Sequence, residues 1–156
     1  MFNFGFQKSS SPVALLTDFG HNDSYVGVMK GVIHGISEDA RIIDLSHNID
    51  PQDVVGAAFV LSSSYEYFPE GTVFVCVVDP GVGTERNVVC MEAEDRIFIA
   101  PDNGLLSNIV NERGADSFHV VENEDFMLGN ISTTFHGRDI FAPVAAHICN
   151  GEEVAN

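Results

Sequence analysis

Short apolar runs typical of buried strands alternate with helical segments in the first half of the chain. Val13–Thr17 and Thr72–Val78 are almost continuously apolar, as strands covered on both faces are. Between these runs, Ser24–Ile36 carries apolar residues at helical spacing, Arg41–Leu45 has the composition of a strand, and Pro51–Ser64 is predicted to be a helix beginning with proline. The order strand-helix-strand-helix-strand predicts an α/β fold in which helices flank a mainly parallel sheet.

The second half of the chain predicts a hairpin followed by further helices. Asn87–Ala93 and Arg96–Ala100 are two β-rich runs separated by only two residues. A helix is expected from about Asn103 to Gly114, a strand over Ser117–Val121, and a last helix over Asp139–Cys149. The chain of 156 residues therefore has the size and the apolar content of one domain.

Composition limits the classes of partner that the protein can bind and the cellular compartment that it suits. The formal net charge of −16 repels nucleic-acid phosphates and anionic lipid surfaces, so we expect neither nucleic acid nor membrane as a partner. No apolar run approaches the roughly 18 residues that span a bilayer. The three cysteines are well separated and include no CxxC pair, which favours a reducing compartment and a cytoplasmic location.

Three aspartates follow predicted strands, where parallel sheets open to a ligand crevice. They are Asp18, Asp79 and Asp102. The carboxylate of Asp18 could accept two hydrogen bonds from a vicinal diol such as that of ribose, or it could instead cap the turn that it begins.

A glycine-rich stretch, Asp79-Pro-Gly-Val-Gly-Thr84, follows the third predicted strand, and Arg86 lies seven positions after Asp79. The stretch is neither a P-loop nor a dinucleotide fingerprint, so it is a tight turn or a ligand cradle. His136 lies in a loop before the last helix. If the fold unites the three side chains, Asp79, Arg86 and His136 could fix and polarise one water molecule.

The remaining candidates have simpler interpretations. Asp23 or Ser24 is placed to cap the helix that follows it. Asn103, within Asp102-Asn-Gly104, most simply caps the next helix, with a ligand role as the alternative. The other histidines lack the spacing of a metal site, and we expect no metal. Four phenylalanines are expected in the core: Phe59, Phe68, Phe74 and Phe98.

Five motifs together resemble the S-adenosylmethionine hydroxide adenosyltransferase family. They are Thr17-Asp-Phe-Gly20, Asp23-Ser-Tyr-Val-Gly27, Asp79-Pro-Gly-Val-Gly-Thr84, Pro101-Asp-Asn-Gly-Leu-Leu106 and Phe135-His-Gly-Arg-Asp139. The resemblance implies hydrolysis of S-adenosyl-L-methionine to adenosine and L-methionine without a cofactor, in enzymes related to the fluorinase and the chlorinase. Halogenating relatives place other residues at positions 79 and 136, so the residues found here resemble those of a hydrolase.

The resemblance also assigns roles to residues. Asp79, Arg86 and His136 are expected to be catalytic and to hold the attacking water or hydroxide. Asp18 is expected to bind the ribose. Asp23 and Asn103 are expected to bind substrate as well.

The family's architecture divides the expected protein into parts. Residues 1–12 are expected to be a flexible lead-in. Residues 13–150 are expected to be an N-terminal α/β catalytic domain of Rossmann-like, three-layer type, and residues 151–156 the start of a linker to a C-terminal β-barrel that this chain lacks. The family forms homotrimers with active sites between subunits, and loss of the β-barrel is expected to expose apolar surface.

Three alternatives remain open at the level of sequence. The chain could be a non-catalytic adenosine-binding or assembly domain, or a truncated inactive fragment of the same enzyme. It could be a metal- or phosphate-handling hydrolase that uses Asp18, Asp79 and His136. It could also be a structural domain without a ligand.

Overall fold

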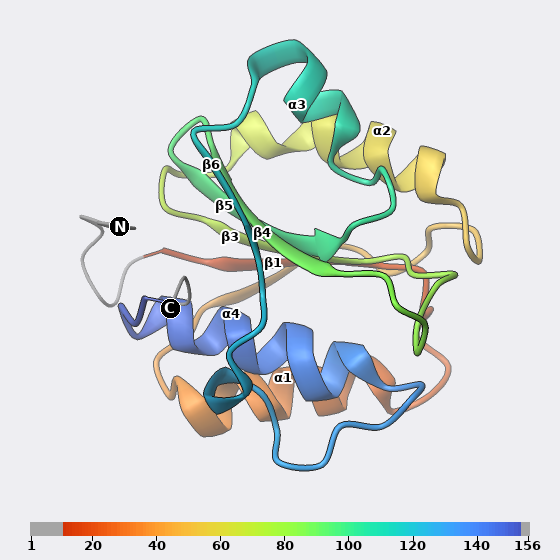
Figure 1. The fold of residues 1–156 in the computed structure, drawn as a ribbon, viewed down its shortest axis with the longest axis vertical. Helices are drawn as coiled ribbons and strands as arrows, with labels where there is room; N and C mark the ends of the chain where they lie inside the picture. The colour runs from red at the N-terminus through yellow and green to blue at the C-terminus, as the bar shows by residue number, and fades with distance from the viewer. Residues whose placement is uncertain (1–10, 154–156) are drawn as a thin grey trace.

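One six-stranded sheet runs through the middle of the molecule, with helices on both faces (Figure 1). The computed structural model describes residues 11–153. Across the sheet the strands are β2 (Ile42–Ser46), β1 (Val13–Thr17), β3 (Val73–Val77), β5 (Arg96–Pro101), β4 (Val88–Ala93) and β6 (Ser117–Val120). The first four are parallel to one another, whereas β4 is antiparallel to both β5 and β6. The predicted α/β class with a mainly parallel sheet is confirmed.

The helices form the two outer layers. On one face lie α1 (Tyr25–Ile36) and α4 (Ala142–Cys149), and on the other lie α2 (Val54–Ser64) and α3 (Ser107–Arg113) (Figure 1). Successive strand residues point to opposite faces, so Leu15 of β1 packs in the α1/α4 core and Leu16 packs in the α2/α3 core. Burial on both faces explains why these strands are continuously apolar.

The predicted hairpin is confirmed, and its turn explains its short connection. Glu94 and Asp95 join β4 to β5, and both have positive φ, 52° and 58°. This is the backbone conformation of a two-residue turn that matches the twist of the strands. The sheet ladder extends back to Pro12, whose carbonyl accepts a hydrogen bond from the Val73 N–H at 3.0 Å. Most of the expected lead-in, residues 1–10, and the last three residues of the chain, 154–156, lie outside the described residues.

The helices α2 and α3 both begin later than the sequence predicts. Helix α2 begins at Val54 rather than at Pro51, because Asp53 is the cap and accepts a hydrogen bond from the Gly56 N–H at 2.9 Å. Helix α3 begins at Ser107, and Asn103 does not cap it. Instead, Asn103 Oδ1 accepts from the Leu105 N–H at 3.2 Å within the preceding turn.

The last helix is irregular where it begins. A single π-helical turn, Gly137–Phe141, follows His136 directly and leads into α4 at Ala142. The predicted start at Asp139 is therefore wrong, because that residue lies inside the π turn. Single π turns are rare and occur often at functional sites.

The phenylalanine predictions are partly wrong. Phe74 and Phe98 are fully buried and stack with ring centroids 5.0 Å apart, and Phe68 packs partly buried against Phe74. Phe59, on the outer side of α2, is 66% exposed. No helix within residues 11–153 is long and apolar enough to cross a membrane.

Phe98→Ala and Phe59→Ala form a matched pair that tests this core. We expect Phe98→Ala to lower the free energy of unfolding by about 3 to 5 kcal/mol, because it leaves a cavity. Phe59→Ala should change it by only about 0.5 kcal/mol, since its ring is mostly in solvent. Urea unfolding followed by circular dichroism measures both. Equal losses would contradict the burial of these two rings.

Candidate active site

Four strands end at the same edge of the sheet, and a polar residue follows each of them closely. The strands are β1, β2, β3 and β5, whose last residues are Thr17, Ser46, Val77 and Pro101. The polar residues that follow are Asp18, His47, Asp79 and Asn103. This is the edge at which ligands bind in open parallel sheets.

Asp79 and Arg86 form a buried bidentate ion pair. Arg86 Nε donates to both carboxylate oxygens of Asp79 at 3.0 Å, and Arg86 Nη2 donates to Oδ2. The side chains are only 4% and 11% exposed, so each charge depends on the other for compensation. The guanidinium carbon also lies 5.8 Å from the centroid of the buried Phe141 ring.

His136 joins this pair through the same guanidinium. Arg86 Nη2 lies 2.8 Å from His136 Nδ1, and because arginine can only donate, Nδ1 must accept. The imidazole is therefore neutral, with its proton on Nε2, and that N–H is a donor. The predicted grouping of Asp79, Arg86 and His136 is thus present in the structure, over a sequence separation of 50 residues between Arg86 and His136.

A close backbone approach brings the two loops of this cluster together. Gly83 has φ of +77°, and a Cβ built on it would lie 2.3 Å from the carbonyl oxygen of Thr133. Only glycine combines this φ with this contact. Gly83 therefore lets the loop that carries Arg86 lie against the loop that carries His136.

A second buried carboxylate, Asp139, holds the His136 loop. Asp139 is 1% exposed and its Oδ2 accepts from the Ser132 N–H at 2.8 Å, while its backbone carbonyl accepts from the Leu128 N–H at 2.9 Å. Arg138 Nε donates to its Oδ1 at 2.6 Å. Burial would raise the pKa of Asp139, but the hydrogen bonds from Arg138 and Ser132 outweigh burial and lower it.

Asp18 lies in the turn after β1 and holds the loop before α2. Its Oδ2 accepts from the Gln52 N–H at 2.7 Å, and Gln52 has a positive φ of 65°. Asp18 therefore does not cap its own turn, which was the alternative interpretation. Its Oδ1 has no hydrogen bond within residues 11–153, so one carboxylate oxygen is free for a ligand.

A row of three aromatic rings connects the Asp18 turn to the His136 loop. Phe19 and Tyr25 have centroids 4.4 Å apart, and Tyr25 and Phe135 have centroids 5.2 Å apart. Burial raises the pKa of Tyr25 to about 12, so its hydroxyl stays protonated near neutrality. The neighbours of Asp18 and His136 in the chain are thus in one packed cluster.

The side chains of the other two predicted substrate-binding residues form hydrogen bonds with backbone groups. Asp23 Oδ1 accepts from the Tyr25 N–H at 2.9 Å at the start of α1, whereas Ser24 makes no side-chain cap bond. Asn103 Nδ2 donates to the Val78 carbonyl at 2.9 Å, which fixes the residue before Asp79. Their roles in binding substrate stay predictions.

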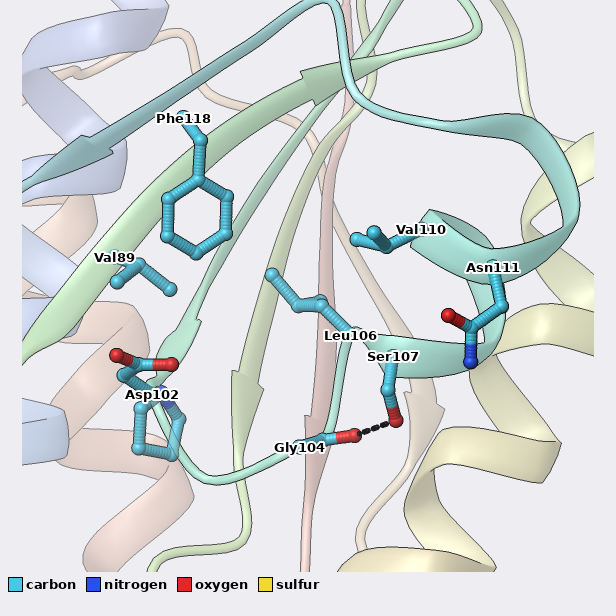
Figure 2. Close-up of a pocket in the computed structure, with 9 residues that line it drawn as sticks. Val89, Asp102, Gly104, Leu106, Ser107, Val110, Asn111 and Phe118 are labelled. Atoms are coloured by element: carbon cyan, nitrogen blue, oxygen red, sulfur yellow. Dashed lines mark hydrogen bonds between the residues drawn. The ribbon is translucent and has the colours of Figure 1, made fainter.

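A separate pocket of about 230 Å³ lies among α3, β4 and β6 (Figure 2). Apolar side chains of Val89, Leu106, Val110 and Phe118 surround it, with Asp102 at one end. None of Asp18, Asp79, Arg86 and His136 lines it. Within the described part of the chain, no three His, Cys, Asp or Glu side chains are grouped so as to hold a metal ion.

Gly83→Ala and Gly114→Ala test the close approach of the two loops. Both glycines have positive φ, +77° and +76°, but a Cβ at Gly114 would meet nothing within 4 Å. Gly114→Ala should lower the free energy of unfolding by about 1 to 3 kcal/mol from backbone strain alone. Gly83→Ala should cost more in urea unfolding, because the carbonyl of Thr133 must move.

The protonation pattern of the His136 ring tests the same two variants, Gly83→Ala and Gly114→Ala. ¹⁵N NMR should show His136 in wild type with its proton on Nε2, and Gly114→Ala should leave that signal unchanged. Gly83→Ala should shift it, because it displaces Arg86 from Nδ1. An unchanged His136 signal in Gly83→Ala would contradict this account of the two loops.

The comparisons with known proteins agree with one another. Residues 13–156 match the family model described as SAM hydroxide adenosyltransferase N-terminal domain. The chain is 39% identical over 150 residues, 95% of its own length and 57% of the relative's, to a protein of Salinispora arenicola named (R)-S-adenosyl-L-methionine hydrolase. It is 40% identical over 152 residues to a protein of the same name from Methanocaldococcus jannaschii, covering 91% and 56%. A fluorinase of Actinopolyspora mzabensis is 28% identical over 162 residues, covering 89% and 54%.

A solved structure has the same fold over nearly all of this chain. A crystal structure of an uncharacterized conserved protein from Thermotoga maritima matches with a TM-score of 0.89 and 45% identity, covering 91% of this chain and 55% of that one. The chain thus spans about half the length of the relatives that it matches. The family model covers almost all of it, and on that ground the chain belongs to the SAM hydroxide adenosyltransferase N-terminal domain family.

Proposed function

We propose that the protein hydrolyses S-adenosyl-L-methionine to adenosine and L-methionine. The observation that carries the proposal is the buried Asp79–Arg86–His136 cluster at the ligand-binding edge of the sheet. Relatives named (R)-S-adenosyl-L-methionine hydrolase, 37–40% identical to this chain, support the same reaction.

The reaction needs little beyond a well-placed oxygen nucleophile. The oxygen of water forms a bond to C5′ while the C5′–S bond breaks, and the electron pair of that bond stays on sulfur. Sulfur leaves as the neutral thioether of L-methionine, so no acid is needed to protonate it. Catalysis therefore depends on holding the oxygen in line with C5′ and away from bulk water, and it requires no cofactor.

The donors of the cluster suit this task. His136 presents its Nε2–H, and Arg86 Nη1 has no hydrogen-bond partner within residues 11–153. We assign these N–H groups to holding the water and to stabilising the hydroxide that forms as the water loses its proton. His136 Nδ1 is occupied by Arg86, so the proton that the attacking water loses goes to Asp79 or to solvent rather than to the imidazole.

The substrate's other parts are assigned to Asp18 and its surroundings. The free Oδ1 of Asp18 supports hydrogen bonding to the ribose diol, with Asp23 and Asn103 as further substrate-binding residues. The formal charge of −16 favours the approach of a cationic sulfonium.

Hydrolysis is favoured over halogenation by two observations. Identity is 37–40% to the relatives named hydrolases and 27–28% to those named fluorinases. Moreover, the resemblance associates the Asp79 and His136 residue types with holding water, whereas halogenating relatives have other residues there.

The proposal extends to assembly and compartment. We infer a catalytic domain over residues 13–150, a linker beginning at 151, and a homotrimer with sites between subunits in the cytoplasm. Free thiols support a reducing compartment: Cys76 and Cys90 are buried and unpaired, and burial raises the pKa of Cys90 to about 12.

Arg86→Ala and Arg86→Lys test the role of the guanidinium. Each protein is incubated with S-adenosyl-L-methionine, adenosine and methionine are quantified by chromatography, and adenosine binding is measured by calorimetry. Arg86→Ala should lower kcat by about 10² to 10³, the usual effect of losing a donor to a developing oxyanion, with little change in binding. Arg86→Lys keeps the positive charge but lacks the planar guanidinium with its paired N–H donors, so it should recover only part of the rate.

Three outcomes would contradict parts of the proposal. Equal losses of kcat and of adenosine affinity in Arg86→Ala would make Arg86 a binding residue. Loss of wild-type activity in EDTA would support a metal-dependent hydrolase instead. Binding of adenosine with no turnover by the wild-type chain would support the non-catalytic alternative.

A further inference from the structure

His47 is a buried titratable residue that the proposed chemistry does not use. It follows β2 at the ligand-binding edge and is 1% exposed. Its spacing in the sequence fits no metal site. In the structure it contacts the turn that carries Asp18, the ring of His21 just beyond that turn at a centroid distance of 5.2 Å, and, through Asp44, Lys30 of α1.

His47 holds the Asp18 turn at both ends. Its ring Nδ1 lies 2.7 Å from Thr17 Oγ1, and its backbone carbonyl accepts from the Gly20 N–H at 2.7 Å. Thr17 Oγ1 also accepts from the Phe19 N–H at 3.2 Å. Asp18 and Phe19 are the residues between these fixed points.

The other side of the imidazole is anchored as firmly. Its Nε2 lies 2.8 Å from Asp44 Oδ1, and Asp44 Oδ2 accepts from Lys30 Nζ at 2.8 Å. Burial would raise the pKa of Asp44, but the hydrogen bonds from Lys30 and His47 lower it. The carboxylate of Asp44 can only accept, so Nε2 carries the ring proton and donates it to Asp44. With that proton on Nε2, Nδ1 accepts from the Thr17 hydroxyl, and the chain of four side chains is satisfied throughout.

We propose that His47 is a positioning residue that fixes the carboxylate of Asp18 for binding a ribose diol. The inference rests on the proposed function, in which Asp18 binds ribose. Asp18 Oδ2 already accepts a hydrogen bond from the Gln52 N–H, so the orientation of the free Oδ1 depends on the backbone of the turn. The Thr17 and Gly20 contacts of His47 set that backbone.

Two nucleosides measure the diol contact separately from the rest of the site. Adenosine carries both ribose hydroxyls, and 2′,3′-dideoxyadenosine carries neither. Calorimetry gives the dissociation constant of each, and we divide that of 2′,3′-dideoxyadenosine by that of adenosine. In the wild-type protein this ratio should be well above one. Asp18→Asn defines the ratio that remains when the carboxylate is absent.

Two substitutions at position 47 separate the two sides of the ring. An Asn amide occupies roughly the place of Nδ1, and a Gln amide roughly that of Nε2. His47→Asn should therefore keep the Thr17 contact and the wild-type ratio. His47→Gln should keep only the Asp44 contact and lower the ratio about tenfold, the effect of one hydrogen bond to a charged group.

Substitutions at Thr17 provide an independent control. Thr17→Val has nearly the same shape but no hydroxyl, so it should lower the ratio as His47→Gln does. Thr17→Ser retains the hydroxyl, so its ratio of dissociation constants should equal that of the wild-type protein. The double variant Thr17→Val, His47→Gln should lose no more than either single variant, because both act through one contact.

A purely structural role predicts a different result. His47→Gln would then weaken both nucleosides equally and leave the ratio unchanged, which would overturn the inference. If wild type shows no preference for adenosine, or Asp18→Asn keeps that preference, the assignment of Asp18 to ribose fails instead.

Amide hydrogen exchange tests the inference without any ligand. The N–H groups of Gly20 and Gln52 should exchange faster in His47→Gln than in His47→Asn, measured against core amides of β3. Equal exchange in the two variants would overturn the positioning role, whatever the nucleosides do.

Discussion

Parallel pairing of β2, β1, β3 and β5 is the constraint on which the site depends. Parallel strands all end at the same edge of the sheet. The residues that come directly after these strands therefore lie close together, although they are far apart in sequence. Asp18, His47 and Asp79 each come within two residues of such an end. β1, β3 and β5 are held by burial on both faces, so the sheet can support polar groups at its edge that contribute little to stability themselves.

Arg86 decides what chemistry that edge can perform. Its charge is nearly buried and compensated by Asp79, and its remaining contact forces His136 to accept at Nδ1. A histidine fixed in this way offers a proton rather than taking one. That suits a reaction whose leaving group is already neutral once the bond breaks, since the site has only to hold an oxygen nucleophile and stabilise its charge.

The sequence predicts the sheet well because apolar runs and their spacing carry that information. The rule that ligands bind after strand ends also predicts Asp18 and Asp79. It cannot predict that Arg86 meets His136, which depends on tertiary contacts such as Gly83 against Thr133; the family resemblance provided that grouping. His47 also follows a strand, but its sequence pattern carries no further signal, since its spacing fits no metal site. Phe59 was misassigned because the outer side of α2 is apolar too.

Hydrolysis of a bound sulfonium requires that the ribose and the nucleophile keep a fixed relation, since small displacements of reacting atoms are costly. The Asp18 turn follows β1 and the His136 loop precedes α4, so no single element connects them. Phe19, Tyr25 and Phe135 fill the space between, and a Cβ on Gly137 would lie 3.3 Å from Tyr25. Glycine at 137 lets the π turn after His136 pack directly on that row. Aromatic packing thus sets the distance between the Asp18 turn and the His136 loop, which in the proposed reaction is the distance from diol to nucleophile.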